Sequence, residues 1–336
     1  MELYTEILEL CADCIQFIPL SKEECQRRYG NDSLFLCGNY QLLEDGKKTG
    51  KVLLYGMKGD EVEQLSSYNC SAIFDLKWDY TADIPCFAQA CSDGTISYSE
   101  IQETSKLSTK STTQIPSNNN TASCLSLSWN TRLSRNSPKL ATSLSDGTIH
   151  ILQKGEDAFE HVSSWKAHEY ETWMTTFDPW SPELLYSGAD DCLLKGWDLR
   201  TPGETFTNNS HTMGVCCIDF DPFEEHKFVT GSYDEKIRLF DSRSVHKPIS
   251  ELELGGGVWR LVYSPHESSK IASACMRNGM KILSIDEGDN ISVEECFEGH
   301  EGLSYGIDWS HCDSGNILAS CSFYNKKLCV WKRNVC

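Results

Sequence analysis

Three aromatic side chains could together hold a positively charged group. Trp173, Trp259 and Tyr305 each stand four residues before an aromatic residue that closes a predicted strand, and Cys216 holds the same position in a neighbouring unit. Aromatic faces attract organic cations by roughly 0.5–2 kcal/mol per ring, quaternary ammonium groups included. If the fold gathers these positions, they form a partial aromatic cage. The alternative is that the rings only pack between structural units.

A second group of residues could carry acid–base chemistry. His211 could be oriented by Asp234, and an imidazole held by a carboxylate is a plausible general base at neutral pH. Arg260 could bind a carboxylate or an oxyanion in a bidentate manner. The sequence predicts catalytic roles for His211, Arg260 and Asp234. It predicts that substrate is bound by Trp173, Trp259, Tyr305, Cys216, Gly256, Gly257 and Arg277.

The sixth unit departs most from the repeat pattern. Three consecutive glycines, of which Gly256 and Gly257 are two, would let backbone N–H groups approach a ligand closely. Arg277 stands where the other units favour a turn aspartate. Either this unit serves a ligand or it is a degenerate copy kept for packing. Ser304, within a G-x-S-x-G string, is not predicted to be a nucleophile, because the string leads from a loop into a strand.

These residues are embedded in a sevenfold repeat. Each copy opens with a strand that ends in an aromatic residue, and a turn precedes its third strand. Six residues beyond each turn position lies the centre of that third strand, and these centres recur at intervals of 43 to 53 residues: Tyr55, Ser99, Leu152, Trp197, Phe240, Leu283 and Trp331. Intervals of this size match a four-stranded blade. The chain is predicted to be an all-β, seven-bladed WD-repeat β-propeller.

The ends of the repeat predict how the ring closes. Too few residues follow Trp331 for a fourth strand, whereas Leu3–Leu8 precedes the first blade without another role. We expect this segment to complete the last blade, so that residues 1–336 form one domain without exposed sheet edges and the protein is a monomer. Residues 103–121, rich in Ser, Thr and Asn, are predicted to be a flexible surface loop.

Composition narrows the class of partner. The net charge of −19 disfavours nucleic acid and favours a basic partner, although acidity can also serve solubility alone. No apolar run is long enough to cross a membrane. The acidic N-terminus carries no signal segment, so the 17 cysteines are expected to be reduced in the cytoplasm. Cys11 and Cys14 lack a second ligand pair, and neither a metal nor a cofactor is predicted.

Several strings resemble one WD-repeat family closely. They are Tyr186-Ser187-Gly188-Ala189-Asp190-Asp191-Cys192, His211-Thr212-Met213-Gly214-Val215-Cys216, Gly257-Val258-Trp259-Arg260, Ala274-Cys275-Met276 and Cys321-Ser322-Phe323-Tyr324. The chain is similar to the WD-repeat diphthine methyl ester hydrolases of diphthamide biosynthesis. The resemblance is strongest over residues 184–283 and 304–331.

The resemblance implies a specific reaction and partner. It implies hydrolysis of the methyl ester on the modified histidine of elongation factor 2, to give diphthine and methanol. His211 would activate water, and Arg260 with the glycine N–H groups would stabilise the oxyanion. Trp173, Trp259 and Tyr305 would hold the trimethylammonium group of the substrate. A non-enzymatic adaptor and a reader of methylated lysine remain alternatives, because the fold alone implies no activity.

Overall fold

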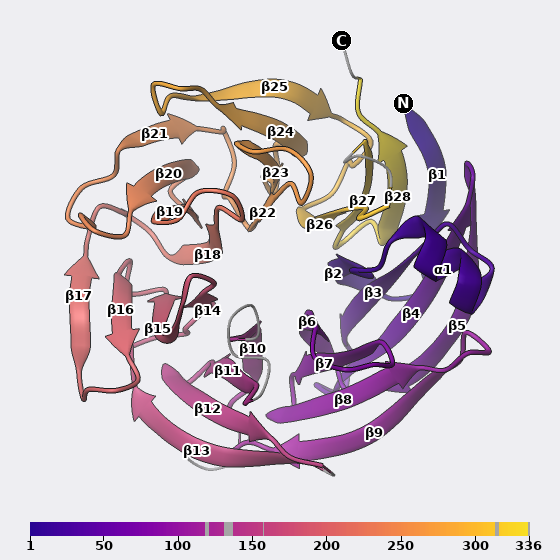
Figure 1. The fold of residues 1–336 in the computed structure, drawn as a ribbon, viewed down its shortest axis with the longest axis horizontal. Helices are drawn as coiled ribbons and strands as arrows, with labels where there is room; N and C mark the ends of the chain where they lie inside the picture. Colours follow the sequence, from indigo (N-terminus) through magenta and orange to yellow (C-terminus); the bar gives the residue numbers. More distant parts are fainter. Residues whose placement is uncertain (118–120, 131–136, 157, 313–315, 335–336) are drawn as a thin grey trace.

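The computed structural model describes residues 1–117, 121–130, 137–156, 158–312 and 316–334. Seven four-stranded antiparallel sheets surround one axis (Figure 1), which confirms the predicted propeller. The first three blades comprise β2 (Cys11–Phe17), β3 (Ser33–Leu42), β4 (Lys48–Lys58) and β5 (Glu61–Cys70); β6 (Ile73–Asp79), β7 (Cys86–Cys91), β8 (Thr95–Ile101) and β9 (Leu107–Gln114); and β10 (Cys124–Trp129), β11 (Lys139–Leu144), β12 (Thr148–Lys154) and β13 (Phe159–Lys166).

The remaining blades follow the same order from the axis outward. They comprise β14 (Met174–Asp178), β15 (Ser181–Gly188), β16 (Leu194–Asp198) and β17 (Glu204–Asn208); β18 (Val215–Phe220), β19 (Lys227–Ser232), β20 (Lys236–Asp241) and β21 (Ser250–Glu253); β22 (Arg260–Tyr263), β23 (Lys270–Ala274), β24 (Met280–Ile285) and β25 (Ile291–Phe297); and β26 (Ser304–Trp309), β27 (Ile317–Ser322) and β28 (Lys327–Lys332), completed by β1 (Glu2–Ile7).

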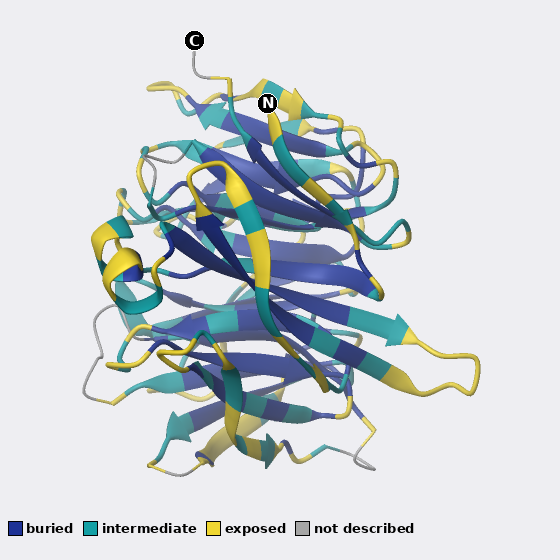
Figure 2. Cartoon of the chain, turned by 90° about the vertical axis from the view of Figure 1, so that its right-hand side faces the viewer, coloured by how far each residue is buried: buried dark blue, intermediate teal, exposed yellow. Residues whose placement is uncertain are grey.

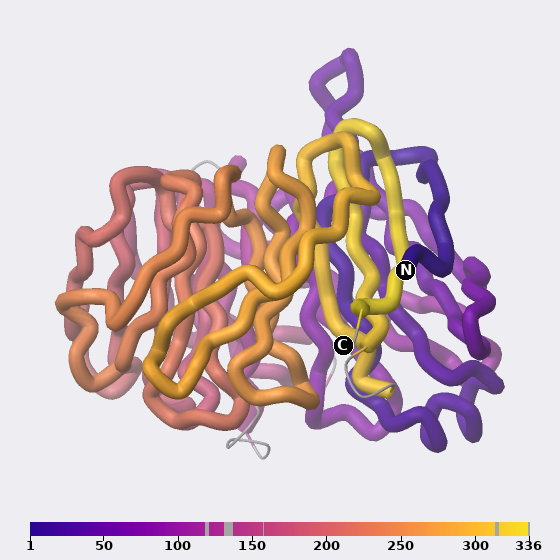
Figure 3. Tube along the Cα trace, turned by 90° about the horizontal axis from the view of Figure 1, so that it is seen from above, coloured from indigo at the N-terminus to yellow at the C-terminus, as the bar shows by residue number. Residues whose placement is uncertain are grey.

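The N-terminal strand closes the ring as expected. β1 pairs antiparallel with β28, from Glu2 opposite Trp331 to Ile7 opposite Lys327. The carboxylate of Glu6 accepts hydrogen bonds from Tyr4 and Tyr55, both at 2.8 Å, which ties the added strand to the first blade. The two chain ends therefore lie in the same part of the ring (Figure 3).

The hydrophobic core lies between the blades. Six of the seven aromatic residues that close the inner strands are buried, and Trp129 is partly buried; Phe17 and Trp309 have no exposed surface. Figure 2 shows buried residues through the inner and middle strands and exposed ones along the outer strands and turns. Side chains of the inner strands also bind the next blade: the backbone N–H of Phe17 donates to Asp308 at 2.7 Å, and that of Leu127 donates to Asp75 at 3.0 Å.

One local prediction needs correction, and one element was not foreseen. Residues 103–121 are not one loop, because Leu107–Gln114 forms β9, paired with β8, and residues 118–120 lie outside the described part. Alternating Ser and Thr suit an outer strand whose faces are both partly solvated. The chain also holds a short helix, α1 (Lys22–Tyr29), between β2 and β3. Its N-cap is Ser21, whose hydroxyl accepts the N–H of Glu24, and it ends at Gly30 with φ of 72°.

Candidate functional site

One residue from each inner strand stands at the same end of the propeller axis. We call this the entry end, because every inner strand begins there. In β2, β6, β10, β18 and β26 a bulge removes this residue from the strand ladder, and in the other two blades it directly precedes the strand. We call the seven positions the mouth ring: Asp13, Phe74, Leu125, Trp173, Cys216, Trp259 and Tyr305.

The three predicted cage residues meet in the mouth ring. The ring centroids of Trp173 and Trp259 are 5.3 Å apart, although they belong to blades four and six. Trp259 also stacks on Tyr305 of blade seven at 4.8 Å and lies 5.9 Å from Tyr233 of blade five. Rings from blades that are not neighbours touch only if they converge on the axis. The sequence rule therefore placed these three residues correctly.

The aromatic surface extends further than predicted. Phe323, in the turn after β27, lies 5.2 Å from Tyr305 and 5.8 Å from Tyr40. Tyr40 in turn lies 5.1 Å from Phe74, the mouth-ring residue of blade two. We call the whole set the aromatic arc: Trp173, Tyr233, Trp259, Tyr305, Phe323, Tyr40 and Phe74. Each of its members is partly exposed, so ring faces are available to a ligand.

Asp13 is the one acidic member of the mouth ring, and it was missed from the sequence. Only 3% of the surface of Asp13 is exposed, and its Oδ1 atom has no hydrogen-bond partner among the described residues. Burial raises the pKa of the Asp13 carboxyl to about 7, because the opposing influence of Arg260 does not outweigh lost hydration and the charge of Asp75. The rule that found Trp173 would have found Asp13, four residues before Phe17, had it been applied to blade one.

Arg260 is engaged within the protein. Its guanidinium Nη1 lies 3.4 Å from Oδ1 of Asp75, and the Arg260 side chain is 13% exposed. The pair joins blade six to blade two, and Asp75 also accepts the N–H of Leu127. The expectation that Arg260 is open to a substrate carboxylate is not met in this structure. Its charge nevertheless lowers the pKa of Asp13, against the larger effect of burial.

His211 precedes β18, and Asp234 lies in the turn after β19, where each is bound to other residues of blade five. The imidazole Nε2 of His211 is 2.8 Å from the Thr230 hydroxyl, and Nδ1 is 2.6 Å from Arg238 and 3.4 Å from Asp234. Burial lowers the pKa of His211, against the influence of Asp234. Burial alone would raise the pKa of Asp234. Hydrogen bonds from His211 and from the backbone N–H of Thr212 nevertheless hold this pKa well below its ordinary value. With both ring nitrogens occupied and its side chain fully buried, His211 is placed as a structural residue, and its role as a base stays a prediction.

The other predicted binding residues divide into packed and exposed positions. A Cβ at Gly256 would lie 2.4 Å from the Cys275 carbonyl oxygen, and one at Gly257 would lie 2.7 Å from Met276 Sδ. Both glycines are buried and let this loop pack closely against the protein itself, so the structure fits the packing alternative for this unit. The Cys216 thiol donates to the Gly214 carbonyl at 3.5 Å, and burial raises its pKa well above the usual value. Arg277 is exposed in the neighbouring turn.

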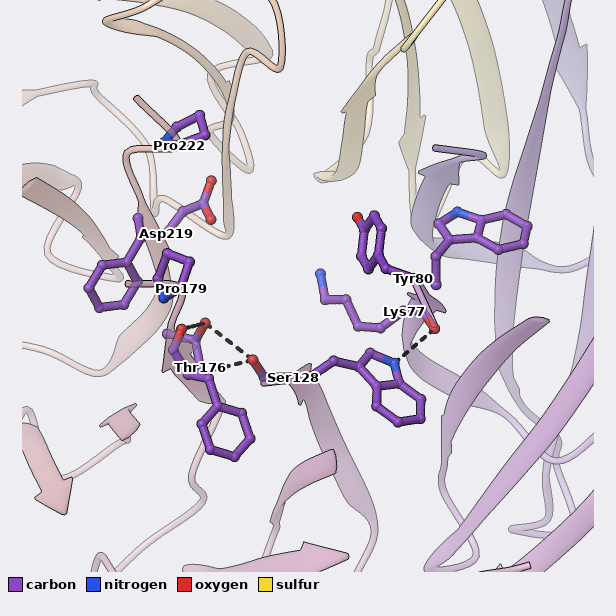
Figure 4. A pocket seen from close by; sticks show the side chains of 11 residues that line it. Lys77, Tyr80, Ser128, Thr176, Pro179, Asp219 and Pro222 are labelled. Atoms are coloured by element: carbon purple, nitrogen blue, oxygen red, sulfur yellow. Dashed lines mark hydrogen bonds between the residues drawn. The ribbon is translucent and has the colours of Figure 1, made fainter. Parts of the chain in front are cut away.

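The opposite end of the axis holds a cavity of about 490 Å³. Figure 4 shows Lys77 and Tyr80 on one wall, with Thr176, Pro179 and Asp219 facing them. Burial raises the pKa of Asp219 to about 6, and Asp219 accepts the backbone N–H of Tyr263 at 2.8 Å. This carboxylate therefore joins blades five and six. Within the described ranges, no group of His, Cys, Asp and Glu is arranged to hold a metal ion.

Across the residues that the structure describes, no helix is both long and apolar enough to span a bilayer.

Comparison with known proteins identifies the family. Residues 202–241 match the family described as "WD domain, G-beta repeat". The chain is 35% identical to the "Diphthine methyltransferase" of Mus musculus, over 90% of this chain and 68% of that protein. It is 30% identical to the "Diphthine methyltransferase homolog" of Dictyostelium discoideum, over 97% and 98% of the two chains. A chain in "Crystal Structure of Mitotic Checkpoint Complex" shares the fold, with a TM-score of 0.76 at 16% identity, over 100% of this chain and 92% of that one.

The relatives' names overturn one expectation. They describe a methyltransferase, which contradicts the ester hydrolysis that the sequence resemblance implied, so the hydrolase prediction is wrong. Strings around repeat turns identify a family and its substrate better than they identify a reaction. The identity and coverage show that the chain belongs to the diphthine methyltransferase family.

Proposed function

We propose that this protein is an enzyme of diphthamide biosynthesis that binds the diphthine side chain of elongation factor 2 and acts on its methyl groups. The proposal combines the family with one structural observation, the convergence of Trp173, Trp259 and Tyr305 at the entry end. Diphthine carries a trimethylammonium group, and aromatic faces bind such groups well. In a methyl transfer to diphthine, a carboxylate oxygen of diphthine would form the new bond to carbon, because its nitrogen is already fully methylated, and the second substrate would leave as the demethylated donor. The chain's own residues would bind and orient the diphthine end.

The aromatic arc supports this substrate in a further way. A quaternary ammonium group has no N–H to donate, so it gains little from hydrogen-bond acceptors and much from apolar faces close to negative charge. The arc supplies such faces from six blades, and the net charge of −19 would steer a basic surface of a translation factor toward the protein. Both proteins are expected to meet in the cytoplasm, which stays a prediction.

Mass spectrometry of elongation factor 2 tests the proposal. The purified protein is incubated with the diphthine-bearing factor and a cell extract depleted of the enzyme, which supplies the second substrate. The modified histidine should change in mass by one CH₂ group only when the enzyme is present. Binding of the factor without any mass change would refute the enzyme and favour a non-enzymatic adaptor. Equal binding of trimethyl-lysine peptides without turnover would favour a reader of methylated lysine.

A variant sharpens this test. Trp259→Ala removes the central member of the arc, which contacts Trp173, Tyr233 and Tyr305. The variant should need a higher concentration of factor for the same mass change. Trp165→Ala is the matched control, because Trp165 lies in the outer strand β13 of blade three and contacts Trp197.

A further inference from the structure

Asp13 gives the mouth ring a single negative charge among aromatic, aliphatic and thiol groups. The bulge between Ala12 and Cys14 removes Asp13 from the β2 ladder, at the position that Trp259 and Tyr305 hold in their own blades. We propose that Asp13 is the counter-ion of the aromatic arc and makes the entry end selective for a permanent organic cation over a neutral group of the same shape. This inference rests on the proposed function, whose substrate carries such a cation.

The carboxylate of Asp13 is not accounted for by the fold. Asp75 accepts a backbone N–H and pairs with Arg260, and Asp308 accepts the N–H of Phe17, so both acids join blades. Asp13 makes no ion pair in the described part of the chain, and its Oδ1 accepts no hydrogen bond there. A carboxyl that is 97% buried and has an oxygen without a hydrogen-bond partner costs stability. Such a group is expected where function requires it.

The surroundings of Asp13 fit a trimethylammonium group better than a primary amine. Together with burial, the charge of Asp13 helps to raise the pKa of the phenols of Tyr40, Tyr233 and Tyr305, and the indole N–H of Trp259 lies close enough to the Asp13 carboxyl to lower its pKa. A primary ammonium would need acceptors for three N–H groups, whereas a trimethylammonium needs only charge and apolar surface. One free carboxylate oxygen below aromatic faces meets the second requirement and not the first.

Protonation of Asp13 should compete with the cation. The charged groups around Asp13 are Arg260 and Asp75, and Lys77 lies beyond them, with its Nζ 3.9 Å from Oδ1 of Asp75. The other ionisable neighbours of Asp13 are the three phenols and the buried thiols of Cys14 and Cys321. The pKa of Arg260 is raised, so it stays cationic near neutral pH, and burial raises the pKa of the phenols and the thiols further above that range. Binding of a permanent cation near pH 7 should therefore release a proton from Asp13, about half a proton per cation bound.

The test compares choline with its neutral isostere 3,3-dimethylbutan-1-ol. Binding to the full-length protein is followed through the indole NMR signals, and calorimetry in buffers of different ionisation enthalpy counts the protons released. Wild-type protein should prefer choline by about tenfold or more, because the isostere keeps the shape and loses the charge. Asp13→Asn should abolish the preference and the proton release. Asp13→Glu should retain the preference, and thermal unfolding checks that each variant is folded.

Asp219→Asn is the matched control. Asp219 is also a carboxyl with a raised pKa, but it lies at the opposite end of the axis. This variant should bind choline as wild type does. If wild type prefers choline and Asp13→Asn keeps that preference, the counter-ion inference is overturned while the proposed aromatic site stands. If wild type binds neither compound, the ammonium site in the proposed function fails, and the inference fails with it.

Discussion

Replacing Asp13 with asparagine should make folding stability depend less on pH. The carboxyl has an ordinary pKa of 3.8 in the unfolded chain, and burial raises it to about 7 in the folded protein. The folded state therefore binds more protons than the unfolded state between these values, so Asp13 lowers stability as pH rises from about 4 to 7. Asparagine cannot ionise. The free energy of unfolding of the variant should exceed that of wild type by a growing margin over this range.

The size of the effect follows from the shift. Three pKa units correspond to about 4 kcal/mol at 1.36 kcal/mol per unit, reached above pH 7 and absent below pH 4. Urea unfolding followed by tryptophan fluorescence, at half-unit steps from pH 4 to 8, gives the difference between variant and wild type. Changes at other titrating groups cancel in that difference.

A control variant separates this effect from a general loss of negative charge. Asp45 has an exposed side chain in the connection between β3 and β4, so Asp45→Asn removes the same charge without removing a buried carboxyl and should change the free energy of unfolding only slightly. If the Asp13→Asn difference is constant from pH 4 to 8, Asp13 does not carry a raised pKa. Burial of the Asp13 carboxyl would then not lower the free energy of unfolding above pH 7.

Three further predictions test other parts of the structure. Trp259→Ala should weaken choline binding by about 2- to 30-fold, the value of one cation–π contact, and equal affinities would show that the arc does not hold the cation. Deleting residues 1–7 should lower the melting temperature and cause self-association on light scattering, because β28 becomes an unpaired edge; an unchanged monomer would contradict closure by β1. His211→Ala should reduce the free energy of unfolding by about 2–4 kcal/mol through its lost bonds to Thr230 and Arg238. If it abolishes the mass change on elongation factor 2 without destabilising the protein, His211 is catalytic after all.

The candidate site was only partly predictable from the sequence. The repeat fixed which residue of each blade stands at the entry end, and this rule placed Trp173, Trp259 and Tyr305 together as observed. It could not show which side chains are occupied by partners inside the protein. His211 and Arg260 have the chemistry of a base and an oxyanion ligand, but the structure engages them with Thr230 and Asp75.

The glycine run of blade six shows the same limit. Consecutive glycines permit close approach of any neighbour, and the sequence does not say whether that neighbour is a ligand or the protein. At Gly256 it is the carbonyl of Cys275, so the glycines allow two turns of the chain to pack. Asp13 shows the converse, since a residue of unremarkable sequence context becomes unusual once burial removes its water.

The sequence by itself determined the number of blades, the order of strands and the closure of the ring. It could do so because period-two alternation and turn residues act over a few neighbours and recur seven times. The tertiary structure decided which side chains meet across the axis and how far each of them is exposed to solvent. The pKa of Asp13 depends on Arg260 and Asp75, which lie in blades six and two, and hydration and charge at such distances in sequence depend on how the whole ring closes.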